Sequence, residues 1–442
     1  MPASSALGPA PRARVARLLG VSALTLALLG AAACEVGPRS PQPASSTTSI
    51  TSTTTQASTA TTRTTAPSST STTPSASTTT TAATATRTPS CAERLAAGLT
   101  PAQRVGQLLM VGLQPSGSSA ALAEQVARDH LGGVIYLGGW QGAGTVERVA
   151  RRLQRATQTR QGATGGVGLL IAADQEGGSV QQLKGAGFTR IPSARTQATL
   201  GAATLRQRAQ SWSLELANAG VNVNLAPVAD TVPTSLGAGN APIGYYRRDF
   251  VPGDAKANAR YVTAFVRGSL EADVAPTVKH FPGLGRVTGN TDLTSSGTTD
   301  RVATKDDPYL QPFAAGIKAG APLVMVSSAR YPRLDAANQA MFSKAVVTDL
   351  LRTRMGFGGV VITDDVGAAA AVASVPVRER ATRFIAAGGD IVLTADATQA
   401  PAMRAGITAR MKASPAFARQ VDASVVRVLE LKTRLGLASC GT

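Results

Sequence analysis

The fold of this chain is decided by Gly359-Val-Val-Ile-Thr-Asp-Asp-Val366, a short β-branched run that stops at two carboxylates. Such a run is typical of a parallel strand that is buried on both faces. A buried strand has no local reason to end in paired acids, but in an α/β barrel the carboxyl end of each strand opens onto the active-site face. We therefore expect Asp364 and Asp365 to lie where chemistry takes place.

Strands alternate with amphipathic helical stretches throughout residues 91–442. Eight strands with helices as crossovers predict a single (β/α)8 TIM barrel. The alternative, a doubly wound open sheet, needs no eighth strand and usually carries a Gly-rich dinucleotide turn, which follows none of these strands. The predicted strands are 105–111, 133–137, 168–174, 223–230, 276–281, 322–328, 359–364 and 390–394, and the predicted helices include 146–156, 205–219, 257–272, 343–355 and 378–387.

The first 33 residues have the parts of an export signal. Three arginines precede an apolar run at 21–29 that is too short to span a bilayer. Ala31-Ala-Ala-Cys34 then resembles a bacterial lipobox, which predicts that Cys34 is lipidated and anchors the protein to the outer face of the cytoplasmic membrane. The alternative is ordinary cleavage after small residues and secretion.

Residues 34–90 consist largely of Ser, Thr, Ala and Pro. A segment with so few large apolar residues cannot bury enough surface to offset its ordering entropy, and it is predicted to be a disordered tether. Cys91 and Cys440 bracket the predicted barrel. In an exported protein they are candidates for a disulfide that joins its two ends, and the alternative is two unrelated buried thiols.

The formal charge of +18 and the aromatic content of 4% bound the partners of the protein. Arginines are scattered along helices without interleaved aromatics, which favours an anionic envelope or polymer over nucleic acid. No His/Cys/Asp/Glu cluster has the spacing of metal ligands, and we expect neither metal nor cofactor.

Charged residues follow several predicted strands. An Asp after a strand is often only a helix N-cap, but four charged strand ends on one rim predict an active site. These ends are Asp174-Gln-Glu176, Asp230, Lys279-His280 and Asp364-Asp365.

The same strand ends carry a family resemblance. Ile171-Ala-Ala-Asp-Gln-Glu-Gly-Gly178, Asn224-Leu-Ala-Pro-Val-Ala-Asp230, Val278-Lys-His-Phe-Pro-Gly283 and Gly356-Phe-Gly-Gly-Val-Val-Ile-Thr-Asp-Asp365 resemble successive signatures of family 3 glycoside hydrolases. The likeness is to the NagZ-like β-N-acetylhexosaminidases, including their lipoprotein members. It implies a retaining mechanism through a covalent glycosyl-enzyme intermediate.

The resemblance also implies roles for single residues. Asp364 matches the nucleophile, while Asp174, Lys279 and His280 match positions that bind the sugar. Arg248 is the nearest match to the sugar-binding arginine of the family, and extra residues after Ile243-Gly244 leave Arg247 as the alternative.

One departure from the family pattern concerns the acid/base. The family reaches an Asp-Ser-His triplet whose His transfers the proton, but this chain has Asn290-Thr-Asp292 there. Its only histidines are His130, which we interpret as structural, and His280. Asp292 can serve if burial or Asp364 raises its pKa. The alternatives are another acid such as Asp300, slow unassisted turnover, or a barrel that binds sugar and hydrolyses poorly.

Three further acids are expected to support the site from behind. Glu176 is a candidate to brace Lys279 or the Gly177-Gly178 turn, Asp230 to orient a strand-four loop or touch a sugar hydroxyl, and Asp365 to hydrogen-bond backbone groups.

Together these features predict a monomeric, exported, lipid-anchored β-N-acetylglucosaminidase that acts on peptidoglycan fragments. The competing hypotheses are a β-glucosidase or other exo-hexosidase of the same family, and a wall-sugar-binding lipoprotein without efficient catalysis.

Overall fold

The structure is a computed structural model that describes residues 88–158 and 163–440. The predicted signal peptide, most of the predicted tether and Cys34 lie outside these residues. The first described helix, α1 (Cys91–Gly98), is capped by Ser90, whose side chain accepts from the amide of Glu93. No helix in the described ranges is long and apolar enough to cross a membrane.

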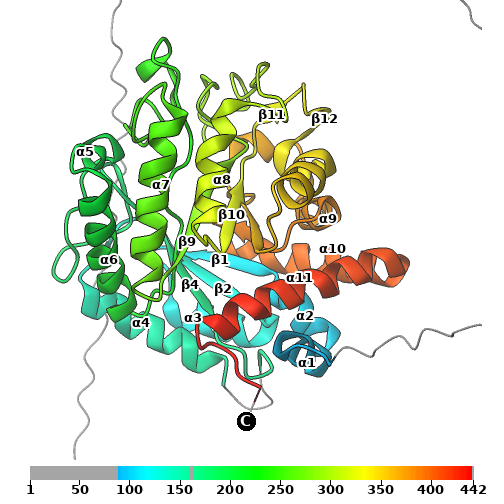
Figure 1. The fold of residues 1–442 in the computed structure, drawn as a ribbon. Helices are drawn as coiled ribbons and strands as arrows, with labels where there is room; N and C mark the ends of the chain where they lie inside the picture. The colour runs from blue at the N-terminus through cyan, green and yellow to red at the C-terminus, as the bar shows by residue number, and fades with distance from the viewer. Residues whose placement is uncertain (1–87, 159–162, 441–442) are drawn as a thin grey trace, which may run out of the picture. The chain divides into compact units, whose positions relative to one another are not determined.

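A parallel sheet of eight strands forms the centre of the described chain (Figure 1). The strands neighbour one another in the order β13-β10-β9-β8-β4-β2-β1-β14, and a further bridge between Ile362 and Ile391 nearly closes the barrel. This sheet confirms the expected α/β barrel. Its strands are β1 (Leu109–Leu113), β2 (Gly133–Tyr136), β4 (Leu170–Ala173), β8 (Val223–Asn224), β9 (Ala275–Phe281), β10 (Leu323–Val326), β13 (Val360–Thr363) and β14 (Val392–Thr394).

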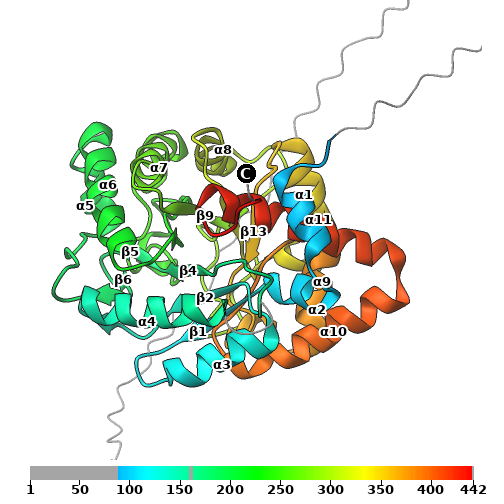
Figure 2. The same ribbon diagram turned by 90° about the horizontal axis from the view of Figure 1, so that it is seen from below.

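Helices surround the sheet and supply the crossovers between its strands (Figures 1 and 2). They are α1, α2 (Pro101–Gln107), α3 (Ser119–Asp129), α4 (Ala143–Ala156), α5 (Ala194–Ala198), α6 (Ala202–Asn218), α7 (Ala255–Leu270), α8 (Gln311–Lys318), η4 (Ala345–Arg354), α9 (Val377–Ala387), α10 (Ala400–Ala413) and α11 (Pro415–Arg434). Loops carry the short strands β3 (Trp140–Gln141), β5 (Gln175–Gly177), β6 (Val180–Gln181), β7 (Leu183–Lys184), β11 (Arg330–Tyr331) and β12 (Asp335–Gln339). Single helical turns are η1 (Gly237–Gly239), η2 (Pro308–Leu310), η3 (Ala340–Phe342), η5 (Ala370–Val372) and η6 (Ala397–Gln399).

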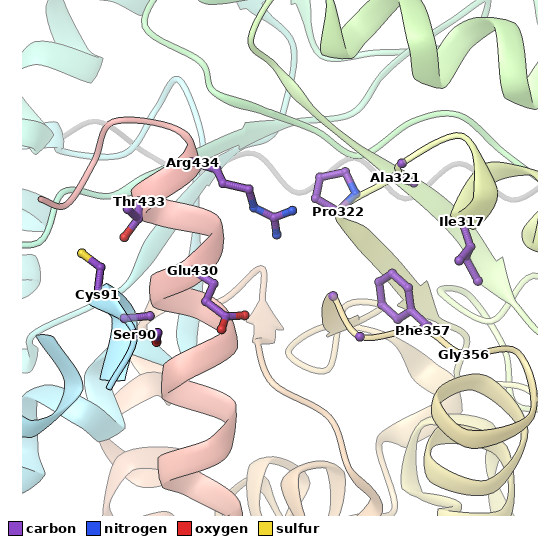
Figure 3. A pocket seen from close by; sticks show the side chains of 14 residues that line it. Ser90, Cys91, Ile317, Ala321, Pro322, Gly356, Phe357, Glu430, Thr433 and Arg434 are labelled. Carbon is purple, nitrogen blue, oxygen red and sulfur yellow. The ribbon is translucent and has the colours of Figure 1, made fainter. Parts of the chain in front are cut away.

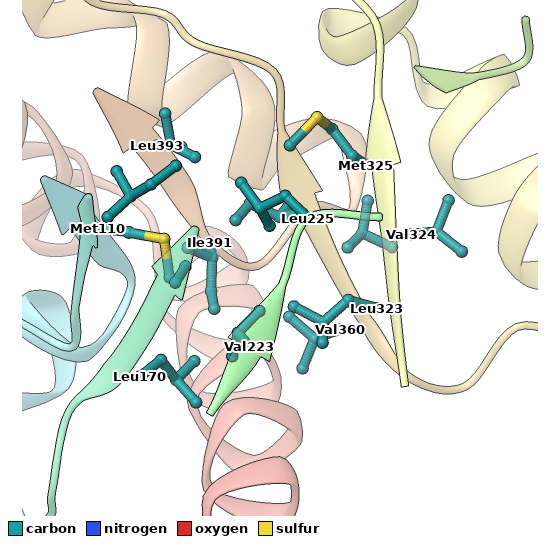
Figure 4. Close-up of a cluster of buried hydrophobic side chains, with 14 of the residues drawn as sticks. Met110, Leu170, Val223, Leu225, Leu323, Val324, Met325, Val360, Ile391 and Leu393 are labelled. Carbon is teal, nitrogen blue, oxygen red and sulfur yellow. The ribbon is translucent and has the colours of Figure 1, made fainter. Parts of the chain in front are cut away.

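Aliphatic side chains from the strands fill the interior of the barrel. Every residue of β13 is buried, as expected for a strand covered on both faces. Figure 4 shows the layer that strand residues build here, with Met110, Leu170, Val223, Leu225, Leu323, Val324, Met325, Val360, Ile391 and Leu393 labelled, all at most 3% exposed. The barrel is therefore a packed core, and ligands have access only at its ends.

The prediction for the first strand, 105–111, was wrong at its start. Residues up to Gln107 belong to helix α2, and β1 begins at Leu109. Thr100 and Gln103 form a capping box, with Pro101 in the first turn, and this local start signal outweighs the apolar character of Val105.

The predicted strand 223–230 was also too long. The regular strand β8 spans only Val223–Asn224, and an isolated bridge joins Val228 to Lys279 farther along. Pro227 has no amide hydrogen for a ladder bond, so the regular strand stops, although the carbonyls of Ala226 and Pro227 still accept from amides of β9 and the amide of Ala229 donates to the carbonyl of Lys279.

A disulfide joins Cys91 to Cys440, with the two Cα atoms 5.7 Å apart. It ties the start of α1 to the segment after α11, and these helices lie side by side in both views (Figures 1 and 2). The bond connects residues separated by 349 positions, so it restricts the unfolded chain over nearly the whole barrel.

We expect the double substitution Cys91→Ala/Cys440→Ala to lower the free energy of unfolding by about 2–4 kcal/mol, because the unfolded chain gains conformational freedom. Urea unfolding of oxidised wild type and of the variant measures the difference. Reductant should shift the wild-type midpoint toward that of the variant and leave the variant unchanged. Equal midpoints for the oxidised wild type and the variant would contradict a stabilising role.

Candidate active site

A cavity of about 610 Å³ opens at the carboxyl ends of the barrel strands. Loops that follow several different strands contribute to its wall, as expected for the active-site face of an α/β barrel. The cavity brings together seven of the residues predicted for the site: Asp174, Arg248, Lys279, His280, Asp292, Asp364 and Asp365. Glu176 and Asp230, which were predicted to support the site, lie behind this surface and are buried.

A network of four charged side chains forms one wall of the cavity. Lys279 on β9 is only 2% exposed, and its ammonium group pairs with Asp174 and, at 2.6 Å, with Glu176. Arg248 reaches Glu176 from the other side with two hydrogen bonds, Nε to Oε2 at 2.8 Å and Nη2 to Oε1 at 2.7 Å. Two cations and two anions thus balance one another in a buried position.

These ion pairs fix the charge of each group. Burial alone would raise the pKa of Glu176, but the charges of Arg248 and Lys279 outweigh it and lower that pKa to about 2. Burial works against the ammonium form of Lys279, yet Asp174 and Glu176 raise its pKa above the ordinary value. Glu176 therefore braces Lys279, as one of its two expected roles required, and it braces Arg248 as well.

The structure distinguishes between the two candidate arginines. Arg248 lines the cavity, while Arg247 is exposed and adopts the left-handed backbone conformation with φ of 55°. That turn directs consecutive residues to different sides of the loop. The Arg248 guanidinium is further held by the carbonyl of Pro242 at 2.8 Å.

His280 is held in one orientation by Asp230. Its Nδ1 lies 2.7 Å from Asp230 Oδ2, and its Nε2 lies 3.3 Å from Nη2 of Arg248. The carboxylate requires a donor and the guanidinium requires an acceptor, so these partners assign the proton to Nδ1. The amide of Leu284 also donates to Asp230 at 2.7 Å. Asp230 thus orients the loop after β9, whereas sequence analysis assigned it to a strand-four loop or to a sugar hydroxyl.

Asp364 lies where β13 ends and lines the cavity. Burial raises the pKa of its carboxyl to about 6, against the lowering influence of Lys279, and Asp292 contributes to the rise. Asp365 has a different environment. Its carboxylate accepts from the amides of Gly367 and Ala395, both at 2.7 Å, and of Ala368 at 2.8 Å. Its carboxylate therefore shapes the loop after β13.

Asp292 lies in the long loop after β9 and faces the same cavity. Asp292 is exposed to solvent as a residue, but the cavity wall around its carboxyl group desolvates it enough to raise its pKa, opposed by Arg248 and supported by Asp365. Its amide donates to Asn290 Oδ1 at 3.0 Å, and its carbonyl accepts from the amide of Ala370 at 3.1 Å. The amide of Ala371 donates in the same way to Thr291 at 3.0 Å. The loop of Asp292 is thereby attached to the loop that follows Asp364.

Asp300, the alternative acid, has other partners. It pairs with Arg286 at 3.3 Å and accepts from the amides of Val302 and Ala303, and it is absent from the cavity wall. Sequence analysis missed Tyr246 and Leu293, which line the cavity as exposed apolar residues. The signal available in the sequence was their position, beside Arg248 and Asp292.

A second cavity of about 600 Å³ lies beside the disulfide, between α11 and the loop before β13 (Figure 3). Glu430 and Arg434 face it from α11, while Pro322 and Phe357 line the opposite side. It has no pair of carboxyl groups and no strand-end polar network, so the cavity at the carboxyl ends is the candidate active site. Within the ranges that the structure describes, no group of His, Cys, Asp and Glu residues could hold a metal ion.

Comparisons with known proteins show the family to which the chain belongs. The model of the glycosyl hydrolase family 3 N-terminal domain matches residues 100–431. The crystal structure of a β-N-acetylhexosaminidase from Beutenbergia cavernae is similar to this chain, with 45% sequence identity and a TM-score of 0.72. The match covers 76% of this chain and 99% of that chain. β-Hexosaminidase LpqI from Mycobacterium tuberculosis is 30% identical over 357 residues, which are 78% of this chain and 86% of that protein. A β-hexosaminidase from Xanthomonas oryzae is 33% identical over 298 residues, 65% of this chain and 83% of its own length. The chain therefore belongs to glycosyl hydrolase family 3, as a NagZ-like glycoside hydrolase.

Proposed function

We propose that this protein is a retaining exo-β-N-acetylglucosaminidase that releases N-acetylglucosamine from peptidoglycan fragments through a covalent intermediate on Asp364. The observation that carries the proposal is the pair Asp364 and Asp292, two carboxyl groups with raised pKa values that line the same cavity. Retaining glycosidases use two such groups about 5 Å apart, one as nucleophile and one as proton donor.

The two carboxyl groups divide the reaction between them. In the first step Asp364 attacks the anomeric carbon, and Asp292 gives its proton to the glycosidic oxygen of the leaving group. In the second step Asp292, now ionised, takes a proton from water as the water attacks the same carbon. The bond to Asp364 breaks, the sugar is released with its original configuration, and Asp292 again carries the proton.

The remaining polar residues hold the sugar during both steps. Asp174, Arg248, Lys279 and His280 offer charged or strongly polar atoms along one wall, where fixed partners for sugar hydroxyls are needed. Their mutual ion pairs keep them in place before substrate binds, which reduces the entropy that binding has to overcome.

The choice of substrate rests on three supports. The relatives named β-hexosaminidase and β-N-acetylhexosaminidase favour an N-acetylhexosamine in the subsite. A formal charge of +18 suits anionic muramyl peptides. The proposed lipid anchor at Cys34 would place the enzyme at the outer face of the cytoplasmic membrane, next to the cell wall.

We expect 5-fluoro-N-acetylglucosaminyl fluoride to leave a sugar adduct on the peptide that contains Asp364, because fluorine slows the second step. Mass spectrometry detects the adduct. Asp364→Asn should form none and should lower kcat by about 10⁴-fold or more, as expected when a nucleophile is removed. Asp349→Asn, an exposed carboxyl outside the cavity, is the matched control and should react like wild type. An adduct on another residue would contradict the proposal. So would an adduct that forms only with the corresponding glucose compound, 5-fluoroglucosyl fluoride.

Asp292→Asn is expected to slow the hydrolysis of disaccharides by about 10²–10⁴-fold, because the leaving oxygen then receives no proton. Nitrophenyl glycosides should lose much less in their first step, since nitrophenolate leaves without protonation. Steady-state kinetics with both substrates, and product analysis in the presence of azide, measure this difference. Asp306→Asn, an exposed carboxyl farther along the same loop, should have no effect. Equal losses for both leaving groups would exclude Asp292 as the acid.

The pH profile of kcat/KM should be bell-shaped with its optimum on the acid side of neutrality. The reactive form is the carboxyl pair carrying one proton, and its apparent constants belong to the pair. Burial and, when ionised, Asp292 raise the pKa of Asp364 to about 6. Since the two carboxyls share the proton of the singly protonated pair, kcat/KM should fall as the pair loses that proton above about this pH. A second proton binds at lower pH and produces the acid limb.

The variant Asp292→Asn provides the check on this assignment. Without the charge of Asp292 the pKa of Asp364 should fall, so the remaining activity on nitrophenyl glycosides should rise to a plateau as pH increases. A variant that kept the fall of kcat/KM above pH 6 would show that this limb arises from another group.

A further inference from the structure

Two solvent-exposed residues with large apolar side chains line the cavity that holds the charged residues of the candidate site. Tyr246 is 36% exposed and Leu293 is 76% exposed, and both line the cavity. Leu293 is the most exposed large hydrophobic residue in the described chain. Large apolar side chains left in water at the edge of a polar site are a common mark of a binding surface.

The position of Leu293 relates it to the leaving group. It directly follows Asp292, which in the proposed mechanism protonates the glycosidic oxygen. The group attached to that oxygen must therefore extend past Asp292. Tyr246 lies two residues before Arg248, which contributes to the wall that holds the released sugar. The two apolar side chains thus lie where the sugar subsite gives way to the space for the leaving group.

A buried asparagine joins the loops that carry these two residues. Asn240 is fully buried, and its Nδ2 donates at 2.7 Å to the carbonyls of both Leu284 and Val287, in the loop of Leu293. Its Oδ1 accepts from the amides of Ile243 at 2.9 Å and Gly244 at 2.7 Å, in the loop of Tyr246. All hydrogen-bonding positions of this side-chain amide are therefore used to hold the two loops together.

Each residue is also supported locally. The ring of Tyr245 packs edge-on against Tyr246 with a centroid distance of 4.9 Å, and Asn290 holds the turn that precedes Leu293.

We propose that Tyr246 and Leu293 form a leaving-group subsite that packs against the apolar face of a second pyranose ring. The hydrophobic C–H face of a sugar ring matches an aromatic ring and an aliphatic side chain, and burying these surfaces together is favourable. This inference rests on the proposed function, and it gives the substrate class as β-linked disaccharides with at least one sugar beyond the scissile bond.

The test compares two substrates that differ only in the leaving group, N,N′-diacetylchitobiose and β-N-acetylglucosaminyl fluoride. The fluoride ion is too small to reach the subsite. Tyr246→Ala and Leu293→Ala should each lower the ratio of kcat/KM for the disaccharide to that for the fluoride by about 10-fold. Leu214→Ala on α6, an exposed leucine outside the cavity, is the matched control and should leave the ratio unchanged. A ratio that stays constant in both cavity variants would overturn the proposal.

A binding measurement separates this proposal from the proposed function. In the Asp364→Asn background, calorimetry should show that the disaccharide binds more tightly than N-acetylglucosamine, and that Tyr246→Ala and Leu293→Ala remove the difference. If wild type hydrolysed neither substrate but this difference appeared, the subsite would stand and the proposed activity would fail. If both sugars bound equally well to the Asp364→Asn protein, the subsite would be refuted whatever the enzyme hydrolyses.

Discussion

The site depends on the burial of one ammonium group, that of Lys279. A buried cation is tolerated only when anions surround it closely, and here Asp174 and Glu176 do so. Glu176 also pairs with Arg248. These ion pairs therefore hold the end of β9, the segment after β4 and the loop before α7 in one arrangement. Removal of Glu176, which pairs with both cations, would leave Arg248 without its carboxylate partner, and such a loss usually costs about 3–5 kcal/mol.

The candidate nucleophile Asp364, in contrast, lowers the stability of the folded protein at neutral pH. Burial raises the pKa of Asp364 from about 4 to about 6, so at neutral pH the folded protein contains a carboxylate that would be more stable in the unfolded chain. The shift corresponds to roughly 2–3 kcal/mol of lost stability above pH 6, which disappears as the pH falls below 4 and both states are protonated. The barrel core and the disulfide supply the stability that lets such a group persist.

The sequence was sufficient for the barrel and for the rim of charged residues because both follow from short local patterns. Buried β-branched runs predicted strands, and Asp364, Lys279 and Asp174 followed from the ends of those strands. The start of β1 was predicted wrongly because the helix cap formed by Thr100 and Gln103 involves only two residues and is easily overlooked beside the apolar run that follows. Asn240 could not be assigned, since its role is to connect two loops whose contact arises only in the fold.

In the proposed mechanism Asp292 transfers the proton, at the position where the family that the sequence resembles has a histidine. An Asp–His dyad fixes the proton-transferring group through a second side chain, whereas a single carboxyl group must be fixed through its own backbone. Here the carbonyl of Asp292 and that of Thr291 accept hydrogen bonds from Ala370 and Ala371, in the loop that begins at Asp364. Backbone bonds persist when side chains change, so the distance between the two carboxyl-bearing loops is independent of the lost histidine. The pKa of Asp292 is raised, as a proton donor needs, because the cavity wall desolvates its carboxyl group and the carboxylates of Asp365 and Asp174 lie nearby.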